Sequence, residues 1–245
     1  MRWRGSSVFS ALAPEIRELA EIYNRGIISV GAAGESLRFA YLQFVRSLAR
    51  ALDARDPCTA GHGWRVSQLS CAVAESLQLP DEHVERIRIG ALLHDIGKLG
   101  ISDRILQKPG ELTDEEYELI REHPMIGRSI LEAVQGFGPC LAAVELHHEN
   151  WDGTGYPRGQ AGEATPIDAR IVHVADAYDA ITTDRSYRRG ISRDEALSIL
   201  RAGAGKQFDP QIVDVIAELA RRQVRKPAPP MQLAIFGTIA EAEIG

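Results

Sequence analysis

Apolar residues recur at helical spacing along most of this chain, whereas the alternation typical of half-buried strands is scarce. In the stretch HGWRVSQLSCAVAESLQL, for example, Val66, Leu69 and Val73 lie on one face of a helix. Such a stripe is buried when helices pack against one another, and the opposite face remains in water. The sequence therefore predicts an all-α fold built from several helices.

Helix-start signals support this prediction. Residues 113–116 and 192–195 each have the Ser/Thr-to-Glu spacing of a capping box. Pro166 suits the first turn of a further helix. The segment RIVHVA, residues 170–175, follows this proline and is also compatible with a buried strand, because short apolar runs do not separate the two structures.

Length and composition favour one large domain with accessory segments. The 245 residues are 44% hydrophobic and 25% charged, which suffices for a substantial buried core. We expect residues 1–40 to form an N-terminal helical segment whose role the sequence does not define. Residues 41–223 should form the main domain, and residues 224–245 a C-terminal tail.

Charge, hydropathy and cysteine content limit the partners and the compartment. A net charge of -6 argues against a protein that mainly grips the phosphates of long nucleic acid. No stretch approaches the roughly 20 apolar residues of a membrane span. Cys58, Cys71 and Cys140 form neither a CxxC pair nor an even set, which suits a reducing compartment. We therefore expect a cytoplasmic protein without a disulfide.

Several histidines and aspartates stand on or beside the apolar stripes, where an unpaired polar group costs free energy. A single inward histidine is more often a hydrogen-bonded core residue than a metal ligand. The coincidence of seven such residues favours a shared metal site. They are His62, His94, Asp95, His123, His147, His148 and Asp176.

Imidazole and carboxylate groups without thiolates suit iron, manganese, zinc or related divalent ions. His94 and Asp95 are adjacent, so both side chains can bind one cation from the same side. A carboxylate has two oxygens and can bridge two ions, which makes Asp95 the candidate bridge. In two-metal hydrolases, ions about 3.5 to 4 Å apart activate water and clamp phosphoryl oxygens. The residues thus predict a two-metal hydrolytic site.

The order of several motifs carries a specific resemblance. HDIGK spans residues 94–98 and GYP spans residues 155–157, together with DPCTAGH, DRILQKPGELT, EHP, HHENWDGTGYPRG, VADAYDAITTDRSYR and GKQFDP. From about Leu48 to Glu218 the chain resembles the HD-GYP domains, a branch of the HD metal-dependent phosphohydrolase superfamily. The resemblance implies a multi-helix HD-type domain over residues 41–223, with the metal site between helices. It also implies hydrolysis of cyclic di-GMP to linear pGpG, and in a further cut to GMP, by metal-activated water.

The resemblance also assigns roles to residues. Its metal-ligand positions match the seven residues named above, and its metals are two divalent ions, with iron or manganese favoured. Lys98 matches a lysine that contacts substrate phosphate or the attacking water, so Asp95 and Lys98 are the expected catalytic residues. Asp179 lies one turn from Asp176 and is expected to orient a ligand or to guard the site. The alternative to this catalytic role is that Lys98 is a surface lysine that caps a helix end.

Substrate contacts are expected from the segments that follow the histidine pair. Tyr156 and Pro157 match signature residues that face a guanine, although WDGTG alone could form a simple turn. Arg185 and Arg188 match positions that bind the substrate phosphates, a task suited to the guanidinium fork. Exposed, solvated arginines are the alternative.

One departure from the family concerns metal number. Some members carry a glutamate four residues before the first histidine ligand, which helps to hold a third metal. Cys58 stands at that position here, so a binuclear site is expected.

Other functions stay open on sequence alone. The chain could act on another nucleotide, such as cyclic GMP-AMP, or serve as a non-catalytic cyclic-dinucleotide receptor or interaction module. A receptor would be expected to lose ligands, and this chain keeps them. Whether it forms a homodimer or binds signalling proteins is also open.

Overall fold

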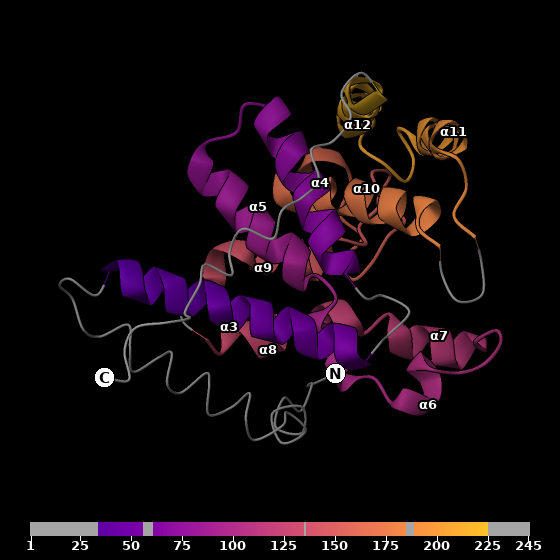
Figure 1. The fold of residues 1–245 in the computed structure, drawn as a ribbon. Coiled ribbons are helices and arrows are strands. Elements are labelled where there is room, and N and C mark those ends of the chain that lie inside the picture. The colour runs from indigo at the N-terminus through magenta and orange to yellow at the C-terminus, as the bar shows by residue number, and fades with distance from the viewer. Residues whose placement is uncertain (1–33, 56–60, 135, 185–188, 225–245) are drawn as a thin grey trace, which may run out of the picture.

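The computed structural model describes residues 34–55, 61–134, 136–184 and 189–224. Its regular elements within these ranges are all helices, and the isolated bridges 152–161 and 204–208 form no strand (Figure 1). The prediction of an all-α fold is confirmed. Residues 170–175 lie inside a helix, so the strand alternative for RIVHVA is wrong.

The helices in chain order are α3 (Gly34–Arg55), α4 (His62–Ser76), α5 (Asp81–Leu93), α6 (Asp103–Leu106), α7 (Asp114–Ile120), α8 (His123–Glu132), α9 (Leu141–Leu146), α10 (Ile167–Thr182), α11 (Arg193–Gly203) and α12 (Pro210–Val224). Three short 3-10 helices, η2 (Ile96–Gly100), η3 (Gly138–Cys140) and η4 (Gly162–Ala164), join them. Both predicted capping boxes are present, at the starts of α7 and α11. Pro166 is the residue before α10, as its fixed φ allows.

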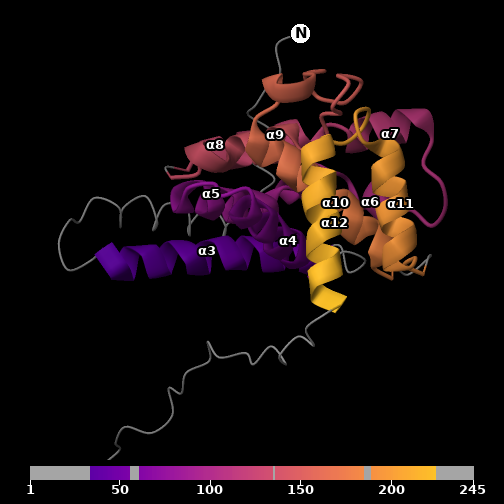
Figure 2. The ribbon, with the colours of Figure 1, turned by 90° about the horizontal axis from the view of Figure 1, so that it is seen from above.

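Two apolar clusters flank a narrower junction. One cluster joins α3, α5, η2 and α8 around the fully buried Phe137. The other joins α4, α5, α10, α11 and α12, with Leu200 and Ile216 at its centre. Figures 1 and 2 show α3 along one side of the bundle and α11 and α12 at the other.

Small residues form the junction between the two clusters. Ala91, Ala143 and Ala175 are fully buried there, so α5, α9 and α10 approach closely. Gly97 serves the same purpose in η2, because a Cβ there would lie 1.8 Å from the carbonyl oxygen of His123. The start of α8 is thereby pressed against the turn that carries His94 and Asp95.

The predicted division into segments remains a prediction. Helix α3 crosses the expected boundary at residue 40, while residues 1–33 and 225–245 lie outside the described ranges. Cys71 and Cys140 are buried free thiols, and burial raises their pKa values to about 11 and about 12. Among the described helices, none combines the length and apolar character needed to span a membrane.

Candidate metal centre

The seven predicted ligand residues lie mainly at helix ends that meet at the junction. His62 begins α4, His94 caps the end of α5, and Asp95 follows it directly. His123 begins α8, and His147 and His148 follow α9. Asp176 lies within α10. Residues more than 100 positions apart in the chain are thus brought into one cluster.

Three overlapping sets of side chains in this cluster could hold a metal. Within each set the candidate ligand atoms lie within 4.8 Å of one another. We call His123, His147 and His148 the histidine group, and His62, His94 and Asp176 the acidic group. The third set, His94, Asp95 and His147, joins the two. Together the three sets contain all seven predicted residues.

Backbone carbonyls fix the orientation of three imidazoles. The Nδ1 atoms of His94, His123 and His147 lie 2.7, 2.7 and 2.9 Å from the carbonyl oxygens of the residues three positions earlier. A carbonyl only accepts, so each Nδ1 carries the proton and each Nε2 keeps a lone pair. The Nε2 atom of His94 is buried without a hydrogen-bond partner. This arrangement is typical of metal-ligating histidines.

In the acidic group, His62 lies between two carboxylates. The Nε2 atom of His62 lies 3.0 Å from Asp176, and its Nδ1 atom lies 2.7 Å from Asp179. Burial alone would lower the pKa of His62, but the two carboxylates raise it to about 9. Arg65 donates to the other oxygen of Asp179 at 2.7 Å. Asp179 therefore contacts the candidate ligand His62 at Nδ1, whereas Asp176 faces its Nε2 atom.

The histidine group contains no carboxylate. The Nε2 atoms of His123 and His147 are 3.2 Å apart, and the rings of His147 and His148 lie 4.1 Å apart. Burial lowers the pKa values of His123 and His147, and it lowers the pKa of His148 to about 3. Near neutral pH these imidazoles are uncharged, so their lone pairs are free to bind a cation.

Asp95 faces both groups with different oxygens. Its Oδ1 atom lies 3.3 Å from Nε2 of His123, and its Oδ2 atom lies 3.6 Å from Nε2 of His94. Nζ of Lys98 lies 2.5 Å from the same Oδ2 atom. Burial would raise the pKa of Asp95, but the charge of Lys98 and the neighbouring histidines hold it well below its usual range. Asp95 is thus a carboxylate in the position that a bridge would need.

Tyr156 covers the histidine group. Its ring stacks on that of His148, with centroids 4.7 Å apart and planes inclined by 25°. The guanidinium of Arg121 lies 4.5 Å from the centroid of the Tyr156 ring. Tyr156 is followed by Pro157 through a cis peptide bond. Arg121 was not predicted as a site residue, although it stands two residues before the predicted ligand His123.

Glu149 holds the turn that contains Tyr156. Its buried carboxylate accepts hydrogen bonds from the backbone N–H groups of Arg158, Gly159 and Gln160, the last two at 3.2 and 2.9 Å. Three donors on one carboxylate fix the backbone immediately after Pro157. This role of Glu149 was not predicted from the sequence, where its position directly after the histidine pair was the available signal.

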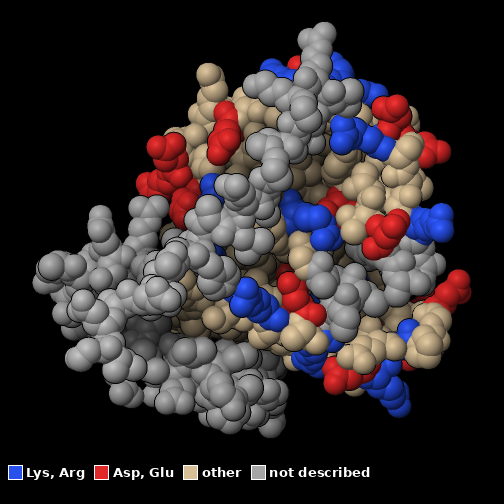
Figure 3. Space-filling model, in the orientation of Figure 1, with Lys and Arg blue, Asp and Glu red and all other residues tan. Residues whose placement is uncertain are grey.

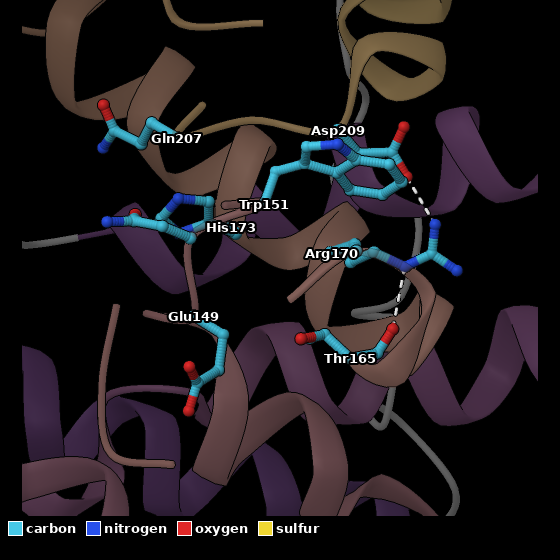
Figure 4. Close-up of a pocket in the computed structure, with 9 residues that line it drawn as sticks. Glu149, Trp151, Thr165, Arg170, His173, Gln207 and Asp209 are labelled. Atoms are coloured by element: carbon cyan, nitrogen blue, oxygen red, sulfur yellow. Dashed lines mark hydrogen bonds and ion pairs between the residues drawn. The ribbon is translucent and has the colours of Figure 1, made fainter. Parts of the chain in front are cut away.

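A small hollow beside the cluster is lined by Glu149, Trp151, Arg170, His173 and Asp209 among others (Figure 4). Arg170 is already paired with Asp209 and donates to the carbonyl of Thr165. The Nδ1 atom of His173 lies 2.6 Å from the carbonyl oxygen of His147. The Arg170, Glu149 and Asp209 side chains of the hollow are thus bound to other protein groups. We therefore assign the hollow a structural role and place the chemistry in the ligand cluster.

The face of the molecule drawn in Figure 3 carries mixed charge. On the face seen in Figure 3, the basic and acidic side chains of the described residues are interspersed. No field of a single sign covers this part of the face.

Some predicted residues lie outside the described ranges. Arg185 and Arg188, the expected phosphate contacts, are among residues 185–188, and Cys58 is among residues 56–60. Their roles remain predictions.

Comparison with known proteins gives the family of this chain. A family model described as "HD domain" matches residues 46–212. The cyclic di-GMP phosphodiesterase response regulator RpfG of Xanthomonas campestris is 44% identical over 171 residues, which cover 69% of this chain and 45% of that protein. A cyclic di-GMP phosphodiesterase of Thermotoga maritima is 39% identical, covering 76% of this chain and 50% of the relative. The 3'3'-cGAMP-specific phosphodiesterase 3 of Vibrio cholerae is 38% identical, covering 70% and 38%.

Solved structures share the fold. The cyclic GMP-AMP specific phosphodiesterase V-cGAP3 of V. cholerae superposes with a TM-score of 0.57 at 22% identity, covering 72% of this chain and 48% of that one. Bd1817, an HDG"Y"P protein of Bdellovibrio bacteriovorus, also gives a TM-score of 0.57 at 22% identity, covering 84% and 69%.

The chain belongs to the HD domain family. Within that family it is an HD-GYP domain, which confirms the resemblance given by its motifs. It spans about half the length of the curated relatives it matches.

Proposed function

We propose that this chain is a metal-dependent phosphodiesterase that hydrolyses cyclic di-GMP to linear pGpG and, in a second cut, to GMP. The observation that carries the proposal is the convergence of seven histidine and aspartate side chains beside Lys98. The Nδ1 atoms of His94, His123 and His147 are engaged by backbone carbonyls, which leaves their Nε2 lone pairs for a metal. The relatives named as cyclic di-GMP phosphodiesterases give the substrate.

We infer that the cluster holds two divalent ions. The histidine group would hold one ion, the acidic group the other, and Asp95 would contact both. The nitrogen and oxygen donors suit iron or manganese. Such ions, when bound, activate water and stabilise negative charge on phosphoryl oxygens. The buried, unpartnered Nε2 atom of His94 fits this assignment, because a buried polar atom without a partner is costly.

The remaining residues of the site bind and orient the substrate. Lys98 would place its ammonium against a phosphoryl oxygen, where positive charge stabilises the charge that develops during cleavage. Tyr156 and Pro157 would face a guanine, with Tyr156 held against His148. Arg185 and Arg188 would bind the distal phosphate. We also propose that the protein acts in the cytoplasm.

Hybrid cyclic GMP-AMP is the second candidate substrate, because relatives at 33 to 38% identity are named 3'3'-cGAMP-specific phosphodiesterases. The two cyclic dinucleotides differ in one base, so a few side chains around Tyr156 would decide between them. A receptor without catalysis is the further alternative.

The first experiment is anaerobic purification and metal quantification, followed by chromatography of cyclic di-GMP and 3'3'-cGAMP incubated with the protein. Wild type is compared with Asp95→Ala and with His83→Ala, a histidine variant outside the cluster. We expect about two iron or manganese ions per chain, and pGpG or GMP from wild type and His83→Ala only. Intact cyclic di-GMP with a filled site would refute the proposed substrate, and cleavage of 3'3'-cGAMP alone would select the second candidate.

A further inference from the structure

The last turn of α3 is bonded to the segment that follows Lys98. The guanidinium of Arg55 donates hydrogen bonds to the backbone carbonyls of Lys98 at 3.4 Å, Leu99, and Ile101 at 2.6 Å. Its Nε atom also donates to Asp103 at 3.0 Å. The Arg55 side chain thus binds two carbonyls within η2 and the carbonyl of the residue that follows η2.

These carbonyls lie at the end of a short helix, where most backbone oxygens lack intrahelical partners. The carbonyl of Lys98 also accepts a hydrogen bond from the backbone N–H of Ile101 at 3.1 Å. A guanidinium is suited to them because its donors are rigid and planar and its charge complements the helix terminus. The side chain of Arg55 is 26% exposed, so these bonds are largely shielded from water. The pair with Asp103 contributes less, because the Asp103 side chain is 65% exposed.

The turn held by Arg55 is the turn that carries Lys98. The backbone N–H of Lys98 donates to the carbonyl of Asp95 at 2.9 Å, and its Nζ atom lies 2.5 Å from the Asp95 carboxylate. On its other side the turn presses against α8 through Gly97, where no side chain fits. Its position therefore depends on α8 on one side and on Arg55 on the other.

The same turn of α3 also contacts the start of α4. The carboxylate of Asp53 accepts a hydrogen bond at 3.1 Å from the backbone N–H of Gly61, the residue before His62. Two side chains at the end of α3 are thus bonded to backbone next to a candidate ligand and next to Lys98. In Figure 1 this end of α3 lies close to α6, which follows the Lys98 turn.

We propose that Arg55 is a positioning residue for Lys98: it couples the end of α3 to the turn that sets the Lys98 ammonium against Asp95 and the substrate phosphate. The proposal rests on the proposed phosphodiester hydrolysis for its kinetic consequence. Loss of the hydrogen bonds from Arg55 would then change turnover by moving Lys98, with the ligand cluster left in place.

A double-mutant cycle tests whether Arg55 acts through Lys98. Arg55→Gln, Lys98→Met and the double variant are compared with wild type on cyclic di-GMP. We expect Arg55→Gln to lower kcat about tenfold or more with little change in KM, because small misplacements of a reacting group are costly. In the Lys98→Met background the same change should alter kcat by less than about twofold, since interacting residues are non-additive. Asp103→Asn, which removes only the exposed partner, should stay within about twofold.

Equal losses in both backgrounds would overturn the proposal, because Arg55 would then act independently of Lys98. Metal content and thermal melting, measured on all variants, separate this result from loss of the cluster or of the fold. An activity-independent readout is hydrogen–deuterium exchange of residues 96–101, which should accelerate in Arg55→Gln and stay unchanged in Asp103→Asn. Unchanged exchange in Arg55→Gln would refute the positioning role even if cyclic di-GMP proved not to be the substrate, whereas an inactive wild type with accelerated exchange would refute the proposed function alone.

Discussion

The histidine group and the acidic group are both buried in one cluster, yet their electrostatics are opposite. In the histidine group, burial outweighs the nearby Asp95 carboxylate, keeps the imidazoles neutral and lowers the pKa of His148 to about 3. In the acidic group, Asp176 and Asp179 overcome the same burial and raise the pKa of His62 to about 9. Desolvation prevails in the histidine group, whereas the hydrogen bonds from two carboxylates outweigh it at His62.

This difference implies two ways of preparing a metal site. The histidine group offers lone pairs that are available over a wide pH range. The acidic group offers negative charge, but its His62 holds a proton that a metal must displace. Asp95, which faces both groups, would let the two ions share one carboxylate.

The largest expected effect comes from removing one ligand from each group. His148→Ala and Asp176→Ala should each lower metal content by about one ion per chain and lower hydrolysis by roughly 10³-fold or more, because one half of a two-metal clamp is lost. Elemental analysis and product chromatography measure both quantities. His83→Ala is the matched control and should keep its metals and activity. Loss of both ions from either variant would show that the groups do not bind independently.

Next in size is the pH dependence of metal binding. In His148→Ala, which retains the acidic group, affinity for Mn²⁺ should fall about tenfold for each pH unit below 9, because the proton on His62 competes with the metal. In Asp176→Ala, which retains the histidine group, affinity should change little between pH 8 and pH 6, since the lowered pKa values leave no proton to displace. Mn²⁺ titrations at three pH values give the slopes. Equal slopes would contradict the electrostatic contrast.

A smaller effect is expected from the residue behind the acidic group. Asp179→Asn should weaken metal binding about 10- to 100-fold, as removal of a partner of a ligating histidine typically does. The same change should lower the pKa of His62 and flatten the pH dependence of metal binding. A chelator competition assay measures affinity at each pH. An unchanged affinity would mean that Asp176 holds His62 without Asp179.

The smallest effect concerns the aromatic cover of the histidine group. Tyr156→Ala should raise the KM for cyclic di-GMP about tenfold, the size of a lost base-stacking contact, while Tyr156→Phe should stay within about threefold because the ring remains. Metal content should be unchanged in both variants. A large fall in kcat with unchanged KM would instead assign Tyr156 to the chemical step.

Much of the fold could be predicted because its helices carry separate apolar and polar faces and clear start signals. The capping boxes at Thr113 and Ser192 are local interactions within four residues, so the sequence alone specifies them. Residues 170–175 were ambiguous because Ile171, Val172, Val174 and Ala175 are all buried. A segment buried on several sides shows no polar face from which its period can be read.

The sequence by itself determined which residues would gather at the centre, because histidines and aspartates on apolar stripes need a common partner. Only the tertiary structure divided them into an acidic and a histidine group, fixed their Nδ1 protons on backbone carbonyls, and set Asp95 between them. Arg55 and Glu149 were likewise invisible as site residues, because their partners are backbone atoms, which every sequence contains alike. Residue type determines what a side chain can bind, whereas the packing of distant helices decides which partner it meets.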